Sequence, residues 1–229
     1  MTTLRALVLL GALLSGPASA QDFVISSGPL GDADFYRLVT CGRPPGGTCR
    51  TRPRRWPEDL AHNLAVSRLA EVDPVSKAVS AQVDAALVQA IDQINGVGAG
   101  VRLHRTPDNT PAPIRLSIRS PATIALIARG HDPDGTLPSG MALLPRVPAD
   151  RITDATILIS SAIPLTEIRS VVLEELIQSL GLVYDIENPA YTRRSIFAQS
   201  ASGVTLLAGQ DAVALQLHYP PLIQAKTDP

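Results

Sequence analysis

One stretch in the middle of the chain constrains the fold more than any other, because its apolar residues repeat with the period of an α-helix. Asp73 and Pro74 form a helix start signal, and Asn95-Gly96 marks an end. The apolar residues between them follow one another mostly at intervals of three and four: Val79, Val83, Ala86, Leu87, Ala90 and Ile94. Such a stripe predicts a long helix with one face packed on a core.

The segments around this helix show the alternation that is typical of strands with one buried face. Alternating apolar and polar residues, or a β-branched run, predict strands at Val101–Leu103, Ile114–Ile118 and Ala155–Ile159, and more weakly at Leu60–Leu69. A second helix begins near Pro164, and a short final helix is predicted at Asp211–His218, before Pro220-Pro221. The residues from Ser120 to Asp150 contain five prolines and are expected to be irregular. This order predicts a single α+β domain with a small twisted mixed sheet.

The first twenty residues have the pattern of a secretory signal peptide. Arg5 precedes an apolar run from Ala6 to Leu14, and Ala18-Ser19-Ala20 forms a small-residue cleavage site. The run is shorter than the roughly 20 apolar residues that span a bilayer, and no later apolar segment is long enough. We therefore expect residues 1–20 to be removed, and the mature protein to be periplasmic or secreted, without a membrane span.

Export makes a disulfide chemically permissible, and the chain has two cysteines to form one. Cys41 and Cys49 are separated by a turn-forming run that contains Pro44-Pro45-Gly46-Gly47. We predict that they form a disulfide that closes a small loop within an N-terminal segment at residues 21–56. A metal site here is the weaker interpretation, because no histidine or further cysteine lies nearby with ligand spacing.

Charge gives little indication of a partner. The chain has 20 basic and 21 acidic residues, a net charge of −1, which favours neither nucleic acid nor an anionic membrane. A local cluster, Arg50, Arg52, Arg54 and Arg55, follows the second cysteine. It either binds an anion or, as is commoner for such runs, forms a solvated loop whose charges repel one another.

The stretch from Leu173 to Leu182 follows the spacing of a zincin active-site helix, in which two histidine ligands four residues apart flank a catalytic glutamate. Aligned in this way, Glu175 stands at the general-base position, and Glu174 and Gln178 stand where the histidines would be. Gly181 stands at the glycine that follows. The third ligand position falls on Tyr184, with Asp185 one residue beyond it.

A further set of residues lies over roughly the last two thirds of the chain: Arg55-Trp56, Glu174-Glu175, Gln178, Leu180-Gly181-Leu182, Asp185, Ser195-Ile196-Phe197, Asp211, Leu215, Leu217, Tyr219 and Pro220. As a set they resemble an uncharacterised family of exported bacterial proteins catalogued as domain of unknown function 2927. This resemblance implies a zincin-like domain, here residues 57–229, whose zinc motif is replaced, and it implies no established activity. His218 departs from the pattern, because an apolar residue is expected before the tyrosine.

Zinc chemistry fits this helix poorly. A catalytic zinc needs three nitrogen, thiolate or carboxylate ligands from the protein, and the carboxamide of Gln178 is a weak ligand. The four histidines, His62, His104, His131 and His218, all lie more than thirty residues from Glu174. We therefore expect no metal and no cofactor.

Acid–base chemistry by the two glutamates is limited by geometry. Adjacent helical side chains point about 100° apart, so Glu174 and Glu175 cannot act on one atom as a pair. Glu175 could act alone, or with Asp185 or Glu187 from the following loop. The simpler interpretation is that Glu174 and Gln178 form a solvated or hydrogen-bonded face, and that Glu175 is a buried carboxylate that holds the loop.

We expect a metal-free, zincin-like protein that binds a peptide or protein in the cell envelope, or that has a structural role. Its candidate binding residues are Glu174, Gln178, Tyr184 and Asp185. In zincins the active-site helix lies under a cleft beside an edge strand, where a peptide can add as a further strand. The alternative is a hydrolase in which Glu175 is the general base, with or without a hard metal ion held by oxygen ligands.

Overall fold

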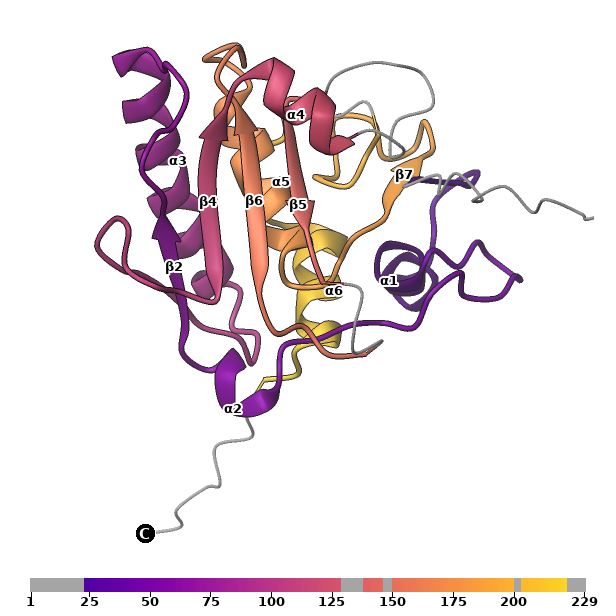
Figure 1. Cartoon of the computed structure of the whole chain (residues 1–229). Helices are drawn as coiled ribbons and strands as arrows, with labels where there is room; N and C mark the ends of the chain where they lie inside the picture. The colour runs from indigo at the N-terminus through magenta and orange to yellow at the C-terminus, as the bar shows by residue number, and fades with distance from the viewer. Residues whose placement is uncertain (1–22, 129–137, 146–149, 200–202, 222–229) are drawn as a thin grey trace, which may run out of the picture.

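The computed structural model describes residues 23–128, 138–145, 150–199 and 203–221, so that the predicted signal peptide lies outside the described residues (Figure 1). Its elements in chain order are β1 (Phe23–Ile25), α1 (Asp32–Cys41), α2 (Glu58–Ala61), β2 (Leu64–Arg68), α3 (Lys77–Gly96), β3 (Leu103–Arg105), β4 (Ile114–Arg119), α4 (Pro121–Ala128), β5 (Gly140–Leu143), β6 (Ala155–Ser160), α5 (Ile168–Gln178), β7 (Asp185–Glu187) and α6 (Gly209–His218).

The larger sheet has five strands in the order β3-β2-β4-β6-β5. Neighbouring strands run parallel except at one edge, where β5 is antiparallel to β6. The longest pairing joins β4 and β6, with Ile114 opposite Ala155 and Arg119 opposite Ser160. The sheet is therefore mixed, and β5 is an edge strand with no described partner on its outer side.

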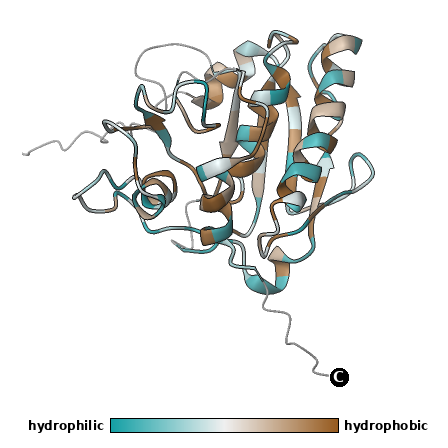
Figure 2. Ribbon diagram, turned by 180° about the vertical axis from the view of Figure 1, so that it is seen from behind, coloured by the Kyte–Doolittle hydropathy of each residue, from teal (hydrophilic) through white to brown (hydrophobic). Residues whose placement is uncertain are grey.

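Two helices, α3 and α5, pack together and cover one face of this sheet (Figure 1). Ser76 caps α3 by accepting a hydrogen bond from the Val79 N–H at 3.2 Å. Every residue of the predicted apolar stripe is buried in the core, and the side of α3 away from the core carries both hydrophilic and apolar residues (Figure 2). The stripe thus forms the helix that its spacing predicts, but the predicted start at Asp73-Pro74 was wrong, because the helix begins three residues later, at Lys77, with Ser76 as its cap.

The N-terminal part of the chain packs on the same core. Phe35 of α1 is fully buried and contacts the rings of Tyr191 and Phe197, with centroids 5.2 and 6.1 Å away. β1, which precedes α1, pairs in parallel with β7 to form a separate two-stranded sheet. Cys41 and Cys49 form the predicted disulfide, with their Cα atoms 5.1 Å apart.

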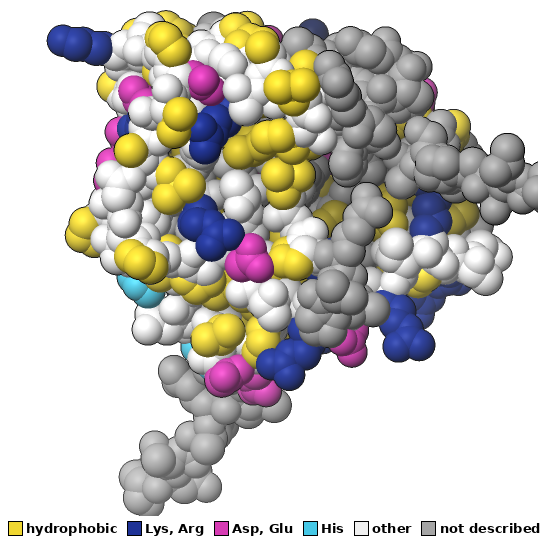
Figure 3. Space-filling view, in the orientation of Figure 1, with side chains coloured by type: hydrophobic (Ala, Val, Ile, Leu, Met, Phe, Trp, Pro, Cys, Tyr) yellow, Lys and Arg dark blue, Asp and Glu magenta, His cyan; other side chains and the backbone are white. Residues whose placement is uncertain are grey.

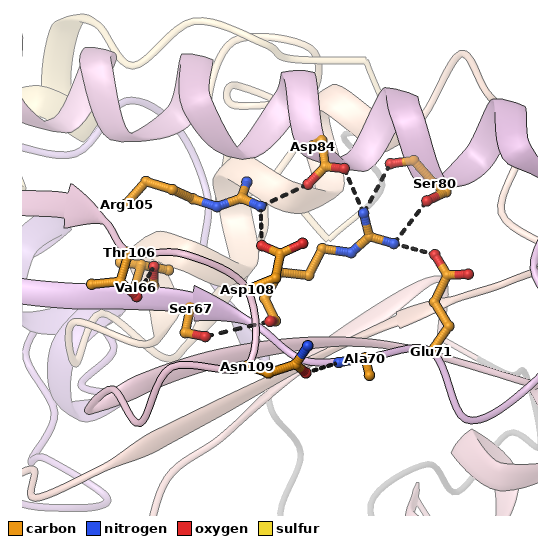
Figure 4. Close-up of polar contacts among 11 residues, drawn as sticks. Val66, Ser67, Ala70, Glu71, Ser80, Asp84, Arg105, Thr106, Asp108 and Asn109 are labelled. Atoms are coloured by element: carbon orange, nitrogen blue, oxygen red, sulfur yellow. Dashed lines mark hydrogen bonds and ion pairs between the residues drawn. The ribbon is translucent and has the colours of Figure 1, made fainter.

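A polar network fixes one end of α3 to the strands beside it (Figure 4). Arg68, at the end of β2, is 5% exposed and donates to Asp84 Oδ2 at 2.5 Å and to Ser80 Oγ at 2.8 Å. It also pairs with Glu71. Arg105 of β3 reaches the other oxygen of Asp84 at 2.9 Å. A nearly buried arginine is tolerated here because carboxylates and a hydroxyl satisfy its donors.

The structure is the single α+β domain that the sequence predicts, and the final helix lies where it was expected. The weakly predicted strand became β2 after a short helix, and the strand predicted at Val101–Leu103 begins only at Leu103. The expectation of irregular structure between Ser120 and Asp150 was wrong in part, because α4 and β5 lie there. Within the described residues, no helix combines the length and apolar character needed to cross a bilayer.

Candidate functional site

The candidate site is built on α5, directly beneath the edge strand β5. Glu175 is only 5% exposed, whereas Glu174 and Gln178 are half-buried on another side of the helix. The glutamate at the general-base position is thus enclosed by protein, and the two residues at the histidine positions lie nearer the surface. This matches the interpretation of Glu175 as a buried carboxylate, but its hydrogen bond is to Ala142 of β5 and not, as was predicted, to the loop that follows α5.

The close approach of Glu175 to β5 depends on a glycine. A Cβ atom on Gly140 would lie 2.5 Å from Val171 Cγ1 and 2.9 Å from Glu175 Oε1. The next outward-facing residue of β5, Ala142, donates its backbone N–H to the Glu175 carboxyl. The other oxygen, Oε2, is buried and has no hydrogen-bond partner among the described residues. Glu175 therefore ties α5 to β5 through one oxygen and leaves the other unsatisfied.

Burial and neighbouring acids determine how these carboxyl groups titrate. Burial raises the pKa of Glu175 well above its ordinary value, the charge of Asp185 raises it further, and the Ala142 N–H lowers it in part. The pKa of Glu174 is raised by burial, by Asp185 and by Glu175, in that order. Both changes favour the protonated carboxyl.

Gln178 and Asp185 hold the end of α5 to the strand that follows it. The Gln178 side-chain amide donates to Asp185 Oδ1 at 3.1 Å, and Asp185 is the first residue of β7. Of the predicted binding residues, the structure thus brings Glu174, Gln178 and Asp185 together beside Glu175. The Gln178 amide serves as a structural donor in this arrangement.

Tyr184 points elsewhere, toward the disulfide loop. Its hydroxyl donates to Thr51 Oγ1 at 3.1 Å, and its backbone N–H donates to the Val39 carbonyl at 3.0 Å. The ring lies so close to Gly42 that a Cβ atom there would be 2.9 Å away. Gly42 also ends α1 in the left-handed conformation. Tyr184 therefore joins the site to the disulfide loop and is not part of the carboxyl cluster.

The turn after α5 is fixed by a contact that only glycine permits. Gly181 has φ 103°, and a Cβ atom on it would lie 2.0 Å from the Arg54 carbonyl oxygen. The same carbonyl accepts a hydrogen bond from His218 Nε2 at 2.9 Å. His218 is fully buried and is the donor of this hydrogen bond.

Two cavities formed by described residues lie away from Glu175. One of about 530 Å³ and another of about 430 Å³ flank the turn around Arg194, near the start of α6, and no residue of the carboxyl cluster lines either. No three His, Cys, Asp or Glu side chains come together as a metal site in the part of the chain described.

Sequence reasoning missed the two residues that bring this edge to the helix, Gly140 and Ala142. Their strand is only four residues long, and its half-buried pattern shows no alternation. One signal was present: the apolar run from Gly140 to Leu144 is bounded by Ser139 and by Pro145.

Comparison with known sequences gives a family. The family described as protein of unknown function DUF2927 matches residues 54–227, which is more than half of the chain. A comparison with curated proteins found no match. The matched range contains α5, β5 and the turn at Gly181, but not α1, β1 or the disulfide loop. The chain therefore belongs to the DUF2927 family.

Proposed function

We propose that this protein is an exported, zincin-like domain without a catalytic zinc, and that it binds an extended peptide or protein segment along the outer edge of β5. It acts in the periplasm or outside the cell, to which the signal peptide directs it. Glu174, Gln178 and Asp185 support the binding edge and do not hold a metal ion.

The placement of α5 supports the zincin-like part of this proposal. In zincins the active-site helix lies under a cleft beside an edge strand. Here the helix with the zincin spacing contacts β5, the antiparallel edge strand of a mixed sheet. Gly181, at the glycine position of the motif, has the positive φ that the turn after such a helix requires.

The proposal that β5 binds a peptide depends on one observation, the hydrogen-bonding pattern of this strand. The Ser160 N–H donates to the Ser139 carbonyl at 2.8 Å, so that Ser139 and every second residue after it bond to β6. Gly140 and Ala142 therefore direct their backbone groups outward, where no described strand pairs with them; the Ala142 N–H donates to Glu175, so the Gly140 N–H and the two carbonyls are the groups that face a ligand. An exposed edge of this kind is a template for another strand.

The experiment selects ligands from a displayed library of random linear peptides and then measures amide exchange at β5 by NMR. We expect the selected peptides to slow exchange at Gly140. Ala142→Pro places a ring at the outer edge without removing a bond to β6, so it should abolish binding; because it also removes the donor that Glu175 accepts, Glu175→Met, which loses that internal bond alone, is the control and should still bind. Ala142→Val changes the side chain but keeps the donor, and it should bind. Peptides that protect another surface, or that bind Ala142→Pro unchanged, would contradict the proposal.

One observation favours hydrolysis as a second candidate function. The buried Glu175 carboxyl has a raised pKa, as a group that exchanges protons in a reaction often has. Glu175→Gln separates the two functions, because glutamine keeps the shape of a protonated glutamate but cannot accept a proton. Cleavage of the selected peptides by the wild type and not by Glu175→Gln would establish the hydrolase, whereas equal binding and no cleavage would support the binding domain.

A further inference from the structure

The segment from α1 to α2 is strongly basic although the whole chain is not. Between Phe35 and Pro57 it contains no aspartate or glutamate, whereas the rest of the chain has 14 basic and 21 acidic residues. We call its six arginines the arginine face: Arg37, Arg43, Arg50, Arg52, Arg54 and Arg55. Dark blue side chains gather over α1 and the segment after it, at the lower right of Figure 3.

This segment is held in place at several points and is not a free loop. The Cys41–Cys49 disulfide closes it, and the N–H groups of Arg50 and Thr51 both donate to the Cys41 carbonyl, at 2.8 and 3.2 Å. At its end Trp56 is buried and donates through Nε1 to the Ser179 carbonyl at 3.0 Å. The arginines are thus presented on a fixed backbone, which reduces the entropy that a partner must overcome.

Most of these charges have no carboxylate partner. Arg43 lies 4.0 Å from Asp34, at the limit of an ion pair. Among the described residues no carboxylate forms an ion pair with Arg37, Arg52, Arg54 or Arg55. Arg55 donates instead to the Tyr36 hydroxyl at 2.7 Å. The face therefore has unneutralised positive charge to offer to an anionic ligand.

The arginine face adjoins the end of the binding edge. Arg54 Nη2 donates to the carbonyl of Pro145, two residues after β5 ends at Leu143. The Arg55 N–H donates to the Asp150 carbonyl at 3.2 Å. In Figure 1 the lower end of β5 runs toward the segment that follows α1. A strand paired with β5 and extended beyond Leu143 would thus pass along the arginine face.

We propose that the arginine face selects ligands whose acidic residues lie next to the segment that pairs with β5. This inference rests on the proposed function, because it assigns the ligand class to the same edge. An acidic peptide is favoured over a small anion because the charges are spread along a segment, and no arginine of the face lines either cavity. Guanidinium groups suit carboxylates because they bind both oxygens at once.

The test uses fluorescent peptides of alternating valine and threonine, which end in a run of aspartate, asparagine or lysine. Binding is measured by fluorescence anisotropy, with the charged run at either end of the peptide. We expect the aspartate peptide to bind about tenfold more tightly than the asparagine peptide at low salt, with the difference shrinking as salt is added. The terminus of the peptide at which the aspartate run increases affinity shows whether the bound strand runs parallel or antiparallel to β5.

Two variants assign the preference to the arginine face. Arg37→Gln with Arg52→Gln removes two exposed charges from the face, and we expect it to lose most of the preference for aspartate. The matched control, Lys77→Gln with Arg169→Gln, removes two exposed charges elsewhere and should keep it. Equal affinity for the aspartate and asparagine peptides, or an aspartate preference unchanged in the first variant, would overturn the inference.

Further outcomes separate this inference from the proposed function. If the asparagine peptide protects the Gly140 amide as well as the aspartate peptide does, the ligand class is wrong and the binding edge stands. If no peptide protects that amide, the proposed function fails, and the inference fails with it. If the wild type sediments with phosphatidylglycerol vesicles and the Arg37→Gln, Arg52→Gln variant does not, the arginine face binds a membrane. That result would also overturn the inference.

Discussion

The buried histidine near the C-terminus gives a quantitative prediction about pH. His218 is fully buried, and burial, with a smaller effect of the Arg55 charge, lowers its pKa from 6.5 to about 3. The ring is therefore neutral in the folded protein: Nε2 donates to the Arg54 carbonyl, and Nδ1 lies 3.3 Å from the Tyr36 hydroxyl. In the unfolded chain the same ring takes up a proton as the pH falls through 6.5.

Acid therefore stabilises the unfolded state relative to the folded one. The stability that the neutral ring contributes is fully present above pH 6.5 and is lost as the pH falls toward 3. Between pH 7 and pH 5 the folded ring stays neutral, so the loss depends only on protonation of the unfolded chain and amounts to about 1.9 kcal/mol. The figure does not depend on how far below 5 the folded pKa lies.

The assay is urea unfolding at pH 7, 6 and 5, followed by the fluorescence of Trp56, the only tryptophan and a buried one. His218→Gln keeps a side-chain N–H for the Arg54 carbonyl but has no titrating group. We expect the variant to be less stable at pH 7, because the ring contacts with Tyr36 and Tyr219 are lost. Between pH 7 and pH 5, however, it should lose about 1.9 kcal/mol less than the wild type.

The control is His104→Gln. His104 is exposed on β3, so the variant should keep the pH dependence of the wild type. If His218→Gln and the wild type lose equal stability between pH 7 and pH 5, the ring is not held neutral and the reasoning is refuted.

Three further predictions concern stability. Gly181→Ala should destabilise the fold by about 3 kcal/mol or more in urea unfolding, because its Cβ would meet the Arg54 carbonyl at a positive φ. A small effect would mean that the turn can move. Cys41→Ser with Cys49→Ser should cost about 2.5 kcal/mol, from the entropy of closing a loop with a sequence separation of 8; an unchanged melting temperature would contradict this. Glu175→Gln should gain stability relative to the wild type between pH 5 and pH 8, since a raised carboxyl pKa means that ionisation costs folding energy as the pH rises. Parallel curves would show that Glu175 is ionised in the fold.

Three of the helices, α3, α5 and α6, could be predicted because their sequences carry their own periodicity. The stripe from Val79 to Ile94 identifies α3 without any partner, and the same holds for α6 before Pro220. The disulfide could be predicted because a proline- and glycine-rich turn joins two cysteines in a chain with a predicted export signal.

The short elements could not be predicted because their partners define them. β5 has four half-buried residues and becomes a strand only by pairing with β6. α1 shows acidic residues at its start and a glycine after its end, but these signals lie beside the disulfide loop and were not interpreted as a helix. Burial of Glu175 was weighed from the sequence, but its contact with β5 depends on Gly140, which is far away in sequence.

The pairing of β1 with β7 has a consequence for the order in which the chain becomes structured. Ser26 and Asn188 are hydrogen-bonded at 3.0 Å although they lie 162 positions apart. A ribosome releases the first of these strands long before it releases the second, so β1 must wait unpaired while most of the domain is synthesised. The Cys41–Cys49 loop needs only local contacts, so its disulfide can close as soon as this segment reaches an oxidising compartment. We therefore expect β1 to pair with β7 last, after the rest of the domain has folded.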